Sequence, residues 1–526
     1  MECSCVRHSD VPGTSKLFTD LVQHFDRVSD LYPIPPNRFD SLKAASKFDF
    51  PDDRRAALVR ALTPLNEGNP SLRELAKPGT VAIVTGQQVG LFSGPAYSIY
   101  KALSAIRIAE SLTASGIPAV PVFWIATEDH DFAEIDHVWV FGAAHRPAKI
   151  QLRDIDAAGA RPAGGIVPGT FPLGELRRAM QGLPFLDEAM ALAEQAYQPG
   201  ASMGGAFAEL LRALFRRFGL LIIDPMDAAI RQLRAPLMRQ AVERMPELVE
   251  ALIARSRELV SRGYHAQVLV DQKTSLAFLL EGGERLALKR NPSGEYIALH
   301  HHLNTPELAG RAAHLSPNAL LRPVIQDYLL PTAAYIGGPA ELAYLAQSQV
   351  VYRKLGQRQP AALPRVGFTL IDERGRKRMA RYGVGPADLF VREQVLHDRI
   401  AKRLVPQSLR DSLQHTRAGV EAALSCFASD LDKFDGSLAS ALKTSRRKIE
   451  YQMGKIERKT AAQIMARDEQ ATRDAALLSG LVYPETHLQE RFYSILPLIA
   501  KFGPGLIDEL HAAIRIDCPD HQFAVV

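Results

Sequence analysis

The segment TEDHDFAE, residues 127–134, places four carboxylates and one imidazole within eight positions, directly after the apolar run VPVFWIA. Three interpretations fit these residue types. Acids at a helix N-terminus stabilise the helix through its dipole, and carboxylates with imidazole suit Mg²⁺ or Mn²⁺. Alternatively, the imidazole and its neighbours orient and activate a substrate, with Asp129 or Asp131 fixing the imidazole tautomer. We favour this hypothesis and predict as catalytic residues Asp129, His130, Asp131 and Glu134.

A second polar motif, TGQQVGLFSGPAYSIYK, occupies residues 85–101 and follows the short apolar run Val81–Val84. It is not a Walker A sequence, which needs GK[ST] after GxxxxG, and it has no GxGxxG fingerprint. Its paired glutamine amides offer donors and acceptors without charge, which suits a polar substrate. Lys101 lies about two turns into the helix expected to begin at Pro95, where it either reaches a phosphate or stays solvated.

A third group of polar residues lies in LRPVIQDY (321–328) and YIGGPAELAY (335–344). The stretch GGPAELAY echoes SGPAYSIY at 93–100, and both place a proline where a helix would begin. Glycine-led helix N-termini are natural anion sites, because their unpaired N–H groups and the helix dipole point outward. We therefore expect the glycines of both stretches to hold anionic groups.

The elements that position these motifs are short buried strands joined by helices. Residues 81–84 and 120–126 read as parallel strands, with a helix through Ile99, Leu103 and Ile106 between them. Such a βαβ unit is right-handed, so both following loops lie at one edge of the sheet. A further strand at 218–227 ends at Asp224. The segment EDHD should therefore face TGQQ and GGP across one crevice.

The predicted substrate- and nucleotide-binding residues are those that the three motifs bring to this edge. They are Thr85, Gly86, Gln87, Gln88, Gly94, Tyr97, Lys101, Trp124, Glu128, Arg322, Gln326, Asp327, Tyr335, Gly337, Gly338 and Glu341.

The chain is almost wholly helical beyond about residue 385. Val420, Leu424, Phe427, Leu431, Phe434 and Leu438 follow a 4-3-4-3-4 spacing, and Ile449, Met453 and Ile456 resume it. This is a heptad seam, and Gly436 allows a helix break. A bundle packing on itself and a coiled coil pairing two chains both fit, and we favour the second. The stretch 443–473, with nine Lys or Arg against four acids, reads as a solvated helix surface rather than an anion-binding face.

Composition places the chain among cytoplasmic globular proteins. The 526 residues carry a formal net charge of +5, and 47% are hydrophobic, which gives no argument for nucleic acid or membrane as a partner. No secretory signal is evident. Cysteines at 3, 5, 426 and 518 form neither a CxxC pair nor a disulfide framework. We expect no bound zinc and no metal-binding residues, although the triple histidine at 300–302 is an alternative ligand group.

Taken together, the motifs resemble one known family. TGQQ.GLF.GP.Y..YK, FW.A.EDHDF.E and RPV.QDYLLPT.AYIGGP.E.AY, ahead of a coiled coil and LQERFY (488–493), resemble the BshC family, the cysteine ligases of bacillithiol biosynthesis. The resemblance covers roughly 15–500. It implies an α/β fold: a Rossmann-like parallel-sheet core with two connecting inserts and a C-terminal α-helical coiled-coil domain that makes a homodimer.

The implied reaction joins the carboxylate of L-cysteine to the amine of glucosaminyl malate. Amide formation from a free carboxylate requires activation, for which we expect ATP as cosubstrate, with or without Mg²⁺. Two other hypotheses remain: a metal-dependent hydrolase or nucleotidyltransferase using the EDHD cluster, and a non-catalytic coiled-coil scaffold. The expected organisation is an N-terminal helical segment (1–78), a discontinuous core (79–145, 201–250 and 317–384), two inserts (146–200 and 251–316), a coiled-coil domain (385–482) and a C-terminal segment (483–526).

Overall fold

The computed structural model describes residues 1–153, 160–435 and 437–526. Two compact units make up the chain. Unit 1 contains Met1–Ala143, Pro147–Thr369 and Glu490–Ala524, and unit 2 contains Ala144–Arg146, Leu370–Gln489 and Val525–Val526. The helical unit thus begins earlier than residue 385, and most of the C-terminal segment returns to unit 1.

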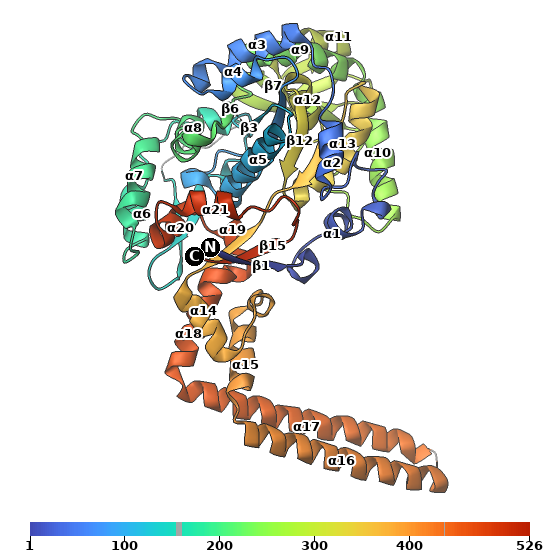
Figure 1. Cartoon of the computed structure of the whole chain (residues 1–526). Coiled ribbons are helices and arrows are strands. Elements are labelled where there is room, and N and C mark those ends of the chain that lie inside the picture. The colour runs from blue at the N-terminus through green and yellow to red at the C-terminus, as the bar shows by residue number, and fades with distance from the viewer. Residues whose placement is uncertain (154–159, 436) are drawn as a thin grey trace. The chain divides into compact units, whose positions relative to one another are not determined.

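A five-stranded parallel sheet forms the centre of unit 1, as predicted (Figure 1). Its order is β13-β12-β2-β3-β6, and every neighbouring pair is parallel. The strands are β2 (Val81–Gln87), β3 (Ala119–Ile125), β6 (Leu221–Ile223), β12 (Thr332–Gly337) and β13 (Ala361–Pro364). The strand order reverses between β2 and β12, and open α/β sheets bind ligands beyond the carboxyl ends of the strands at such a point.

Both faces of this sheet are apolar, because successive side chains of a strand alternate between faces. Ala82 and Val84 belong to the larger core cluster. Val81 and Ile83 belong to the smaller cluster, where α5 (Tyr97–Ala114) packs. The sheet is therefore covered on both sides, and only its edges and strand ends can carry polar chemistry.

The other helices of unit 1 cover the sheet and complete the N- and C-terminal parts. They are α1 (Lys16–Gln23), α2 (Phe39–Ala45), α3 (Asp52–Leu62), α4 (Ser71–Leu75), α6 (Leu173–Ala179), α7 (Leu186–Ala196), α8 (Met203–Phe215), α9 (Ala228–Glu243), α10 (Met245–Ser261), α11 (Thr305–Gly310), α12 (Arg322–Leu329), α13 (Pro339–Lys354), α20 (Ile495–Phe502) and α21 (Leu506–Ala513).

The helix α5 begins at Tyr97 rather than at the predicted Pro95. Before it, the chain makes a tight turn in which Phe92, Ser93 and Gly94 all have positive φ. A Cβ added to Gly90 would lie 2.8 Å from the Cα of Gly94. This close approach delays the helix until the chain has left the turn.

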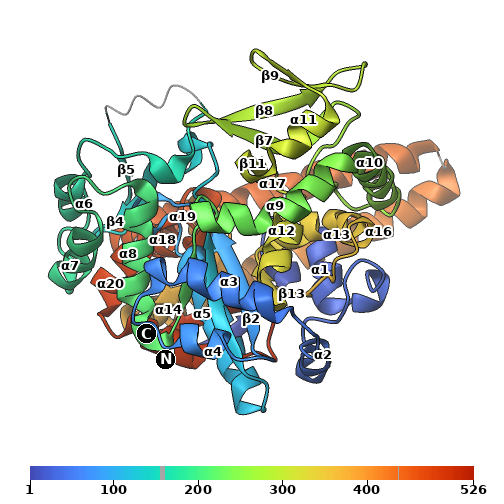
Figure 2. The same cartoon turned by 90° about the horizontal axis from the view of Figure 1, so that it is seen from above.

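An antiparallel sheet of five strands forms a second layer, which Figure 2 shows apart from the parallel sheet. Its strands are β7 (Thr274–Glu281), β8 (Glu284–Arg290), β9 (Tyr296–Ala298), β10 (His301–Leu303) and β11 (Leu315–Pro317). β7 and β8 form a hairpin within the insert predicted at 251–316. Gly282 and Gly283 both have positive φ, as a two-residue hairpin turn requires. A smaller sheet pairs β4 (His137–Phe141) with β5 (Pro147–Gln151).

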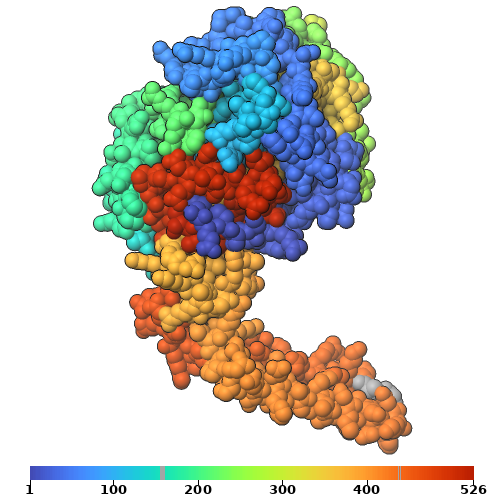
Figure 3. Space-filling view, in the orientation of Figure 1, coloured from blue at the N-terminus to red at the C-terminus, as the bar shows by residue number. Residues whose placement is uncertain are grey.

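The two ends of unit 1 meet in a three-stranded sheet of order β1-β15-β14. Its strands are β1 (Glu2–Val6), β14 (Phe368–Ile371) and β15 (His521–Val525). In Figure 3, the dark blue N-terminal residues lie on the surface beside the red residues of the C-terminal segment.

Unit 2 is helical, as predicted. It contains α14 (Glu373–Tyr382), α15 (Glu393–Leu404), α16 (Gln407–Phe434), α17 (Ser437–Arg467) and α18 (Glu469–Val482). α16 and α17 pack side by side, and Arg417 Nη2 lies 3.0 Å from Glu457 Oε2. The predicted break at Gly436 lies outside the described residues.

Only part of the predicted heptad seam packs within this helix pair. Val420, Leu424 and Leu431 are half-buried, but Phe427 and Phe434 are 54% and 84% exposed. The half-buried side chains of α16 continue at Ala428 instead of Phe427. Among the described residues, no helix is long and apolar enough to cross a membrane.

Candidate functional site

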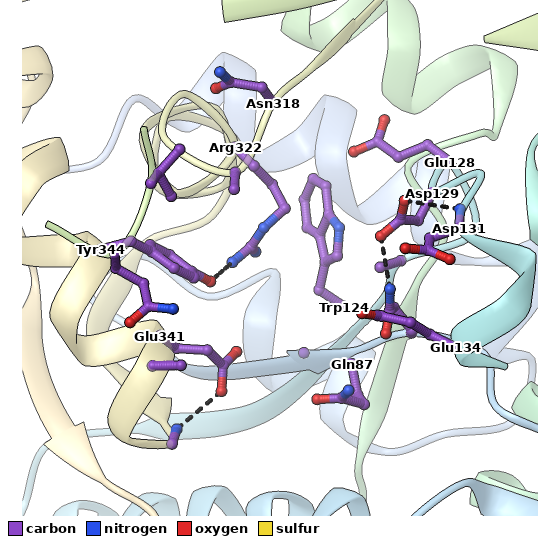
Figure 4. A pocket seen from close by; sticks show the side chains of 18 of the residues that line it. Gln87, Trp124, Glu128, Asp129, Asp131, Glu134, Asn318, Arg322, Glu341 and Tyr344 are labelled. Carbon is purple, nitrogen blue, oxygen red and sulfur yellow. Dashed lines mark hydrogen bonds between the residues drawn. The ribbon is translucent and has the colours of Figure 1, made fainter. Parts of the chain in front are cut away.

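A cavity of about 940 Å³ opens at the carboxyl ends of β2, β3 and β12 in unit 1. Its lining holds five carboxylates and five Lys or Arg side chains. In Figure 4, Trp124 stands between the acids of the EDHD segment and the group formed by Arg322, Tyr344 and Glu341. The cavity therefore has an acidic side and a basic side within one enclosure.

On the acidic side, Asp129 is held by hydrogen bonds from three directions. Its Oδ2 accepts from Gln88 Nε2 at 2.9 Å, and its Oδ1 accepts from the backbone N–H groups of His130 and Asp131. The predicted meeting of TGQQ and EDHD is thus a direct contact. Within the described residues, the carboxylates of Asp131 and Glu134 have no hydrogen bond or ion pair, so both are free to meet a ligand.

Glu128 is buried, and its charge is balanced by an arginine that the sequence analysis missed. Arg234 of α9 is fully buried and donates to Glu128 Oε2 at 3.0 Å and to the carbonyl oxygen of Leu315 at 2.9 Å. Ser316 Oγ donates to the same carboxylate oxygen at 3.1 Å. Glu128 therefore fastens β3 to α9 and β11, and its buried charge is compensated.

His130 is bound by an arginine from the antiparallel sheet. Arg285 of β8 places Nη1 2.9 Å from His130 Nδ1, while its other nitrogens donate to Ser316 Oγ and the Pro317 carbonyl, both at 3.0 Å. A guanidinium has only donors, so Nδ1 must be the acceptor and the proton of the neutral ring lies on Nε2. Burial, followed by the charge of Arg285, lowers the pKa of His130, which keeps the ring neutral.

This contact corrects the predicted orientation of the imidazole. Asp129 Oδ1 lies 3.8 Å from His130 Nδ1, beyond hydrogen-bonding distance, so neither it nor Asp131 fixes the tautomer. The ring of Phe278 of β7 packs edge-on against the imidazole. The guanidinium carbon of Arg285 lies over the same ring, 3.8 Å from the ring centre. The β7–β8 hairpin is therefore the element that sets the ring.

On the basic side, Lys101 is neither solvated nor free for a phosphate. It is 1% exposed, lies 2.5 Å from Glu341 Oε2, and donates to the Gly86 carbonyl and to Gln87 Oε1, both at 2.8 Å. Burial lowers the pKa of Lys101 to about 8 despite the opposing effect of Glu341. Lys101 thus joins α5, β2 and α13 beneath the cavity.

Glu341 occupies the helix N-terminus that was predicted to hold an anion. Its Oε2 accepts from the Gly338 N–H at 2.9 Å, and its Oε1 accepts from Tyr335 OH at 2.6 Å. Burial by itself raises the pKa of Glu341, but Lys101 and the Gly338 N–H outweigh it, so the pKa lies below its usual value. The N-terminus of α13 is therefore capped by the chain's own carboxylate.

Three arginines complete the basic side. Arg322 donates to Tyr344 OH at 2.6 Å and to Gln326 Oε1 at 3.1 Å. Arg365 makes a two-pronged ion pair with the buried Glu490, at 2.8 and 2.7 Å. Arg491 is exposed and, within the described residues, has no hydrogen bond or ion pair, although its guanidinium lies 5.9 Å from the centre of the Tyr97 ring.

The structure brings fourteen of the twenty predicted site residues to the cavity. Those that line it are Gly86, Gln87, Gln88, Tyr97, Lys101, Trp124, Glu128, Asp129, His130, Asp131, Glu134, Arg322, Gly338 and Glu341. A Cβ on Gly86 would lie 2.8 Å from the Trp124 carbonyl oxygen, so glycine is needed where β2 and β3 approach most closely.

The remaining six do not line the cavity, and several support it from behind. They are Thr85, Gly94, Gln326, Asp327, Tyr335 and Gly337. Thr85 Oγ1 donates to the Ile336 carbonyl at 2.9 Å and so ties β2 to β12. Asp327 accepts hydrogen bonds from Tyr352 OH and Gln326 within the core, where burial raises its pKa. Gly94 belongs to the turn before α5.

Sequence reasoning assigned no role to several residues that line or support the cavity. They are Arg234, Arg285, Tyr344, Arg365 and Arg491. Arg491 lies within LQERFY, which was quoted but not assigned a role, and Arg285 lies in the hairpin stretch EGGERLALKR. Within the described residues, no group of three or more His, Cys, Asp or Glu could hold a metal ion. In the triple histidine, His301 pairs with Glu281.

Comparisons with known proteins agree along the whole chain. A family model described as bacillithiol biosynthesis BshC, N-terminal Rossmann-like domain, matches residues 1–366, and one described as its C-terminal coiled-coil domain matches 368–526. A protein of Solibacter usitatus is 51% identical, and the match covers 100% of both chains. Proteins of Koribacter versatilis and Salinibacter ruber are 34% and 31% identical over at least 96% of each chain. All three bear the name "Putative cysteine ligase BshC".

Proposed function

This chain belongs to the BshC family of bacillithiol biosynthesis, and we propose that it joins the carboxylate of L-cysteine to the amine of glucosaminyl malate. One observation carries the proposal: a single cavity at the switch point of a Rossmann-like sheet has free carboxylates on one side and a free arginine on the other. This pairing suits amide formation, since it can bring an ammonium-bearing substrate to an anionic activated carboxyl group.

The carboxylate must be activated before an amine can displace its oxygen. We propose ATP as the activating cosubstrate, with or without Mg²⁺, through either an acyl-adenylate or an acyl-phosphate. In both routes the leaving group is anionic. Arg322 and Arg491 are the cations placed to meet it, because Lys101 and the Gly338 N–H are already engaged by Glu341. The volume of about 940 Å³ lies at the upper end of the range for ligand sites and leaves room for more than one substrate.

The acidic side suits the amine substrate. At neutral pH an alkyl amine is an ammonium ion, which the carboxylates of Asp129, Asp131 and Glu134 attract. The ammonium must lose one proton before it attacks and a second as the amide forms. A carboxylate at the attacking nitrogen can accept the first proton, which is general base catalysis.

We also propose that unit 2 mediates a homodimer. Among the described residues, six large apolar side chains on α16 and α17 are exposed when the helices are paired within one chain: Leu409, Phe427, Phe434, Leu438, Tyr451 and Ile456. A second copy of the helix pair would remove these side chains from water, which is the main driving force of such association.

The test is a direct assay of the ligation. The purified protein is incubated with L-cysteine, glucosaminyl malate and Mg-ATP, and the thiol product is measured by mass spectrometry. Product should form only with all three substrates present, and Glu134→Gln should reduce it, whereas Asp53→Asn, an exposed carboxylate on α3 outside the cavity, should not. If the unaltered protein forms no product, the ligase proposal is wrong. If it forms the same amount of product without ATP, the proposal of ATP as cosubstrate is wrong.

A further inference from the structure

We propose that Arg285 is a positioning residue that holds His130 as a hydrogen-bond donor, so that His130 stabilises an oxygen of the reacting carboxyl group and does not remove the amine proton. This inference rests on the proposed ligase function and divides the work within its acidic cluster. The amine proton then goes to a carboxylate, Asp131 or Glu134.

The side chain of Arg285 has a fixed orientation. Its side chain is 6% exposed, its Nε and Nη2 donate to Ser316 Oγ and the Pro317 carbonyl, and its planar group lies over Phe278. These contacts leave Nη1 pointing at His130 Nδ1 at 2.9 Å. An arginine remains charged at any pH at which the protein folds, so the contact persists only while Nδ1 keeps its lone pair.

The consequence concerns the second ring nitrogen. With Nδ1 accepting, the neutral imidazole carries its proton on Nε2 and has no lone pair there. A general base needs a free lone pair, so this ring cannot take a proton from the amine without breaking the Arg285 contact. A second proton on Nδ1 is opposed by burial and by the adjacent guanidinium, which outweigh the charges of Asp129 and Asp131, in agreement with the lowered pKa of His130.

In the proposed ligation, every proton and electron pair has a stated destination. One ammonium proton passes to the Asp131 or Glu134 carboxylate, and the amine nitrogen attacks the activated carboxyl carbon. Electrons of the C=O bond move to oxygen, where His130 Nε2–H donates a hydrogen bond to the developing negative charge. The electrons on that oxygen then re-form the C=O bond as the bond to the leaving oxygen breaks with its electron pair, and the nitrogen loses its second proton to water.

The first test is structural and independent of turnover. In protein labelled with ¹⁵N at histidine, the His130 resonances are identified by their loss in His130→Gln. Nε2 should be protonated and Nδ1 unprotonated at neutral pH, and Arg285→Met should convert the ring to a tautomer mixture while Arg285→Lys restores the preference in part. Protonation of Nδ1 in the unaltered protein would overturn the proposal, whether or not ligase activity is found.

The second test separates a donor from a base by turnover. Glutamine can place an N–H near the position of imidazole Nε2, whereas asparagine reaches only the position of Nδ1. We expect kcat to fall by about 10²-fold in His130→Asn and to recover at least several-fold in His130→Gln, with the acidic limb of the kcat/KM pH profile retained. If His130→Gln is as inactive as His130→Asn and that limb disappears, His130 is the base.

A different observation carries a second proposal. We infer that Cys5 and Cys518 form a reversible intramolecular disulfide, a modification site that fastens β1 to the segment before β15. Their sulfur atoms lie 3.0 Å apart although 513 positions separate them. Neighbouring contacts hold the same two segments: Ser4 Oγ donates to the Phe523 carbonyl at 3.3 Å, and His8 Nε2 lies 2.8 Å from the Pro519 carbonyl.

The oxidant is a disulfide of a low-molecular-weight thiol. Exchange transfers two electrons and two protons from the protein thiols to the small disulfide, which leaves as two thiols. Burial and the hydrogen bond between the two cysteines raise the pKa of Cys5 to about 11, so the exchange should accelerate with rising pH as the thiolate fraction grows.

Cystine is the probe, and peptide mapping is the readout. Incubation should yield a linked peptide pair containing Cys5 and Cys518, and unfolding of the oxidised protein should require more urea than that of the reduced protein. Cys3→Ser should behave as the unaltered protein, and Cys518→Ser should abolish both effects. Linkage of Cys3 instead of Cys5, a cross-link between chains, or only mixed disulfides with cysteine would overturn the proposal.

Discussion

Lys101→Met should destabilise unit 1 by about 3–5 kcal/mol, the usual cost of removing one partner of a buried ion pair. The substitution removes the ammonium group that lies 2.5 Å from Glu341 Oε2 and leaves that carboxylate, whose side chain is only 20% exposed, without its cation. It also leaves the Gly86 carbonyl and Gln87 Oε1 without their donor. The double variant with Glu341→Gln should recover most of the loss, because no unpaired charge then remains.

The magnitude follows from two opposing contributions. Two unit charges at the observed separation attract by about 7 kcal/mol at an effective dielectric constant of about 20, while desolvation costs several kcal/mol per ion. The intact ion pair therefore contributes little to the free energy of unfolding. Replacing Lys101 alone removes the attraction, while the desolvation cost of Glu341 remains. The remaining hydrogen bonds from Gly338 and Tyr335 limit the loss.

The pH dependence has a definite sign. Burial lowers the pKa of Lys101 from 10.5 to about 8 in the folded protein. Between these values the unfolded chain binds more protons, so the free energy of unfolding rises with pH. Lys101→Met should lack this rise, and the difference between the two proteins should therefore widen from about pH 8 to pH 10.5.

Urea unfolding followed by tryptophan fluorescence is the assay, because both tryptophans, Trp124 and Trp139, lie in unit 1. Lys77→Met is the matched control, since its ion pair with Glu74 is exposed and should be worth less than about 1 kcal/mol. The reasoning fails if Lys101→Met costs no more than this control, or if the double variant is no more stable than the single one.

Three further predictions test the site and the assembly. Asp129→Asn should lower turnover by about 10²-fold through misplacement of the loop, because its amide replaces one of the two acceptor oxygens that face Gln88 and the His130 N–H with a donor; kcat at saturating substrate measures this, and unchanged turnover contradicts it. Light scattering should give a dimer at micromolar concentration that Phe427→Asp with Phe434→Asp dissociates, because both side chains are exposed in the single chain, and a monomeric native protein would refute the dimer. Elemental analysis after dialysis should find no zinc, and about one zinc per chain would contradict that prediction.

The position of the site could be predicted because strand direction follows from topology. A right-handed βαβ unit places the loops after β2 and β3 at one edge, and the Gln88–Asp129 hydrogen bond is the result. What no local pattern contains is the partner of each charge. Arg234 and Arg285 come from stretches separated from Glu128 and His130 by 106 and 155 positions, and only tertiary packing brings them together.

At the glycine-led helix N-termini, too, the sequence did not identify the partner of a polar group. The prediction of an anion at Gly338 followed from unpaired N–H groups, and the structure supplies the anion from within as Glu341. The heptad pattern likewise specified apolar positions but not their partner. Val420 and Leu424 are half-buried in the helix pair, while Phe427 and Phe434 remain exposed, because one helix can contact its neighbour with only one part of an apolar stripe.

The pairing of charges inside the cavity decides which groups can act on substrates. Lys101 is paired with Glu341, Glu128 with Arg234, and Arg365 with Glu490. These ion pairs hold the side chains of the cavity wall in place. Within the described residues, the charged side chains of the lining with no hydrogen bond or ion pair are Asp131, Glu134 and Arg491. A substrate with an ammonium group would meet the two carboxylates, and an anionic group would meet the arginine. The protein's own ion pairs thus leave a bipolar cavity, which suits the proposed reaction between an amine and an activated carboxylate.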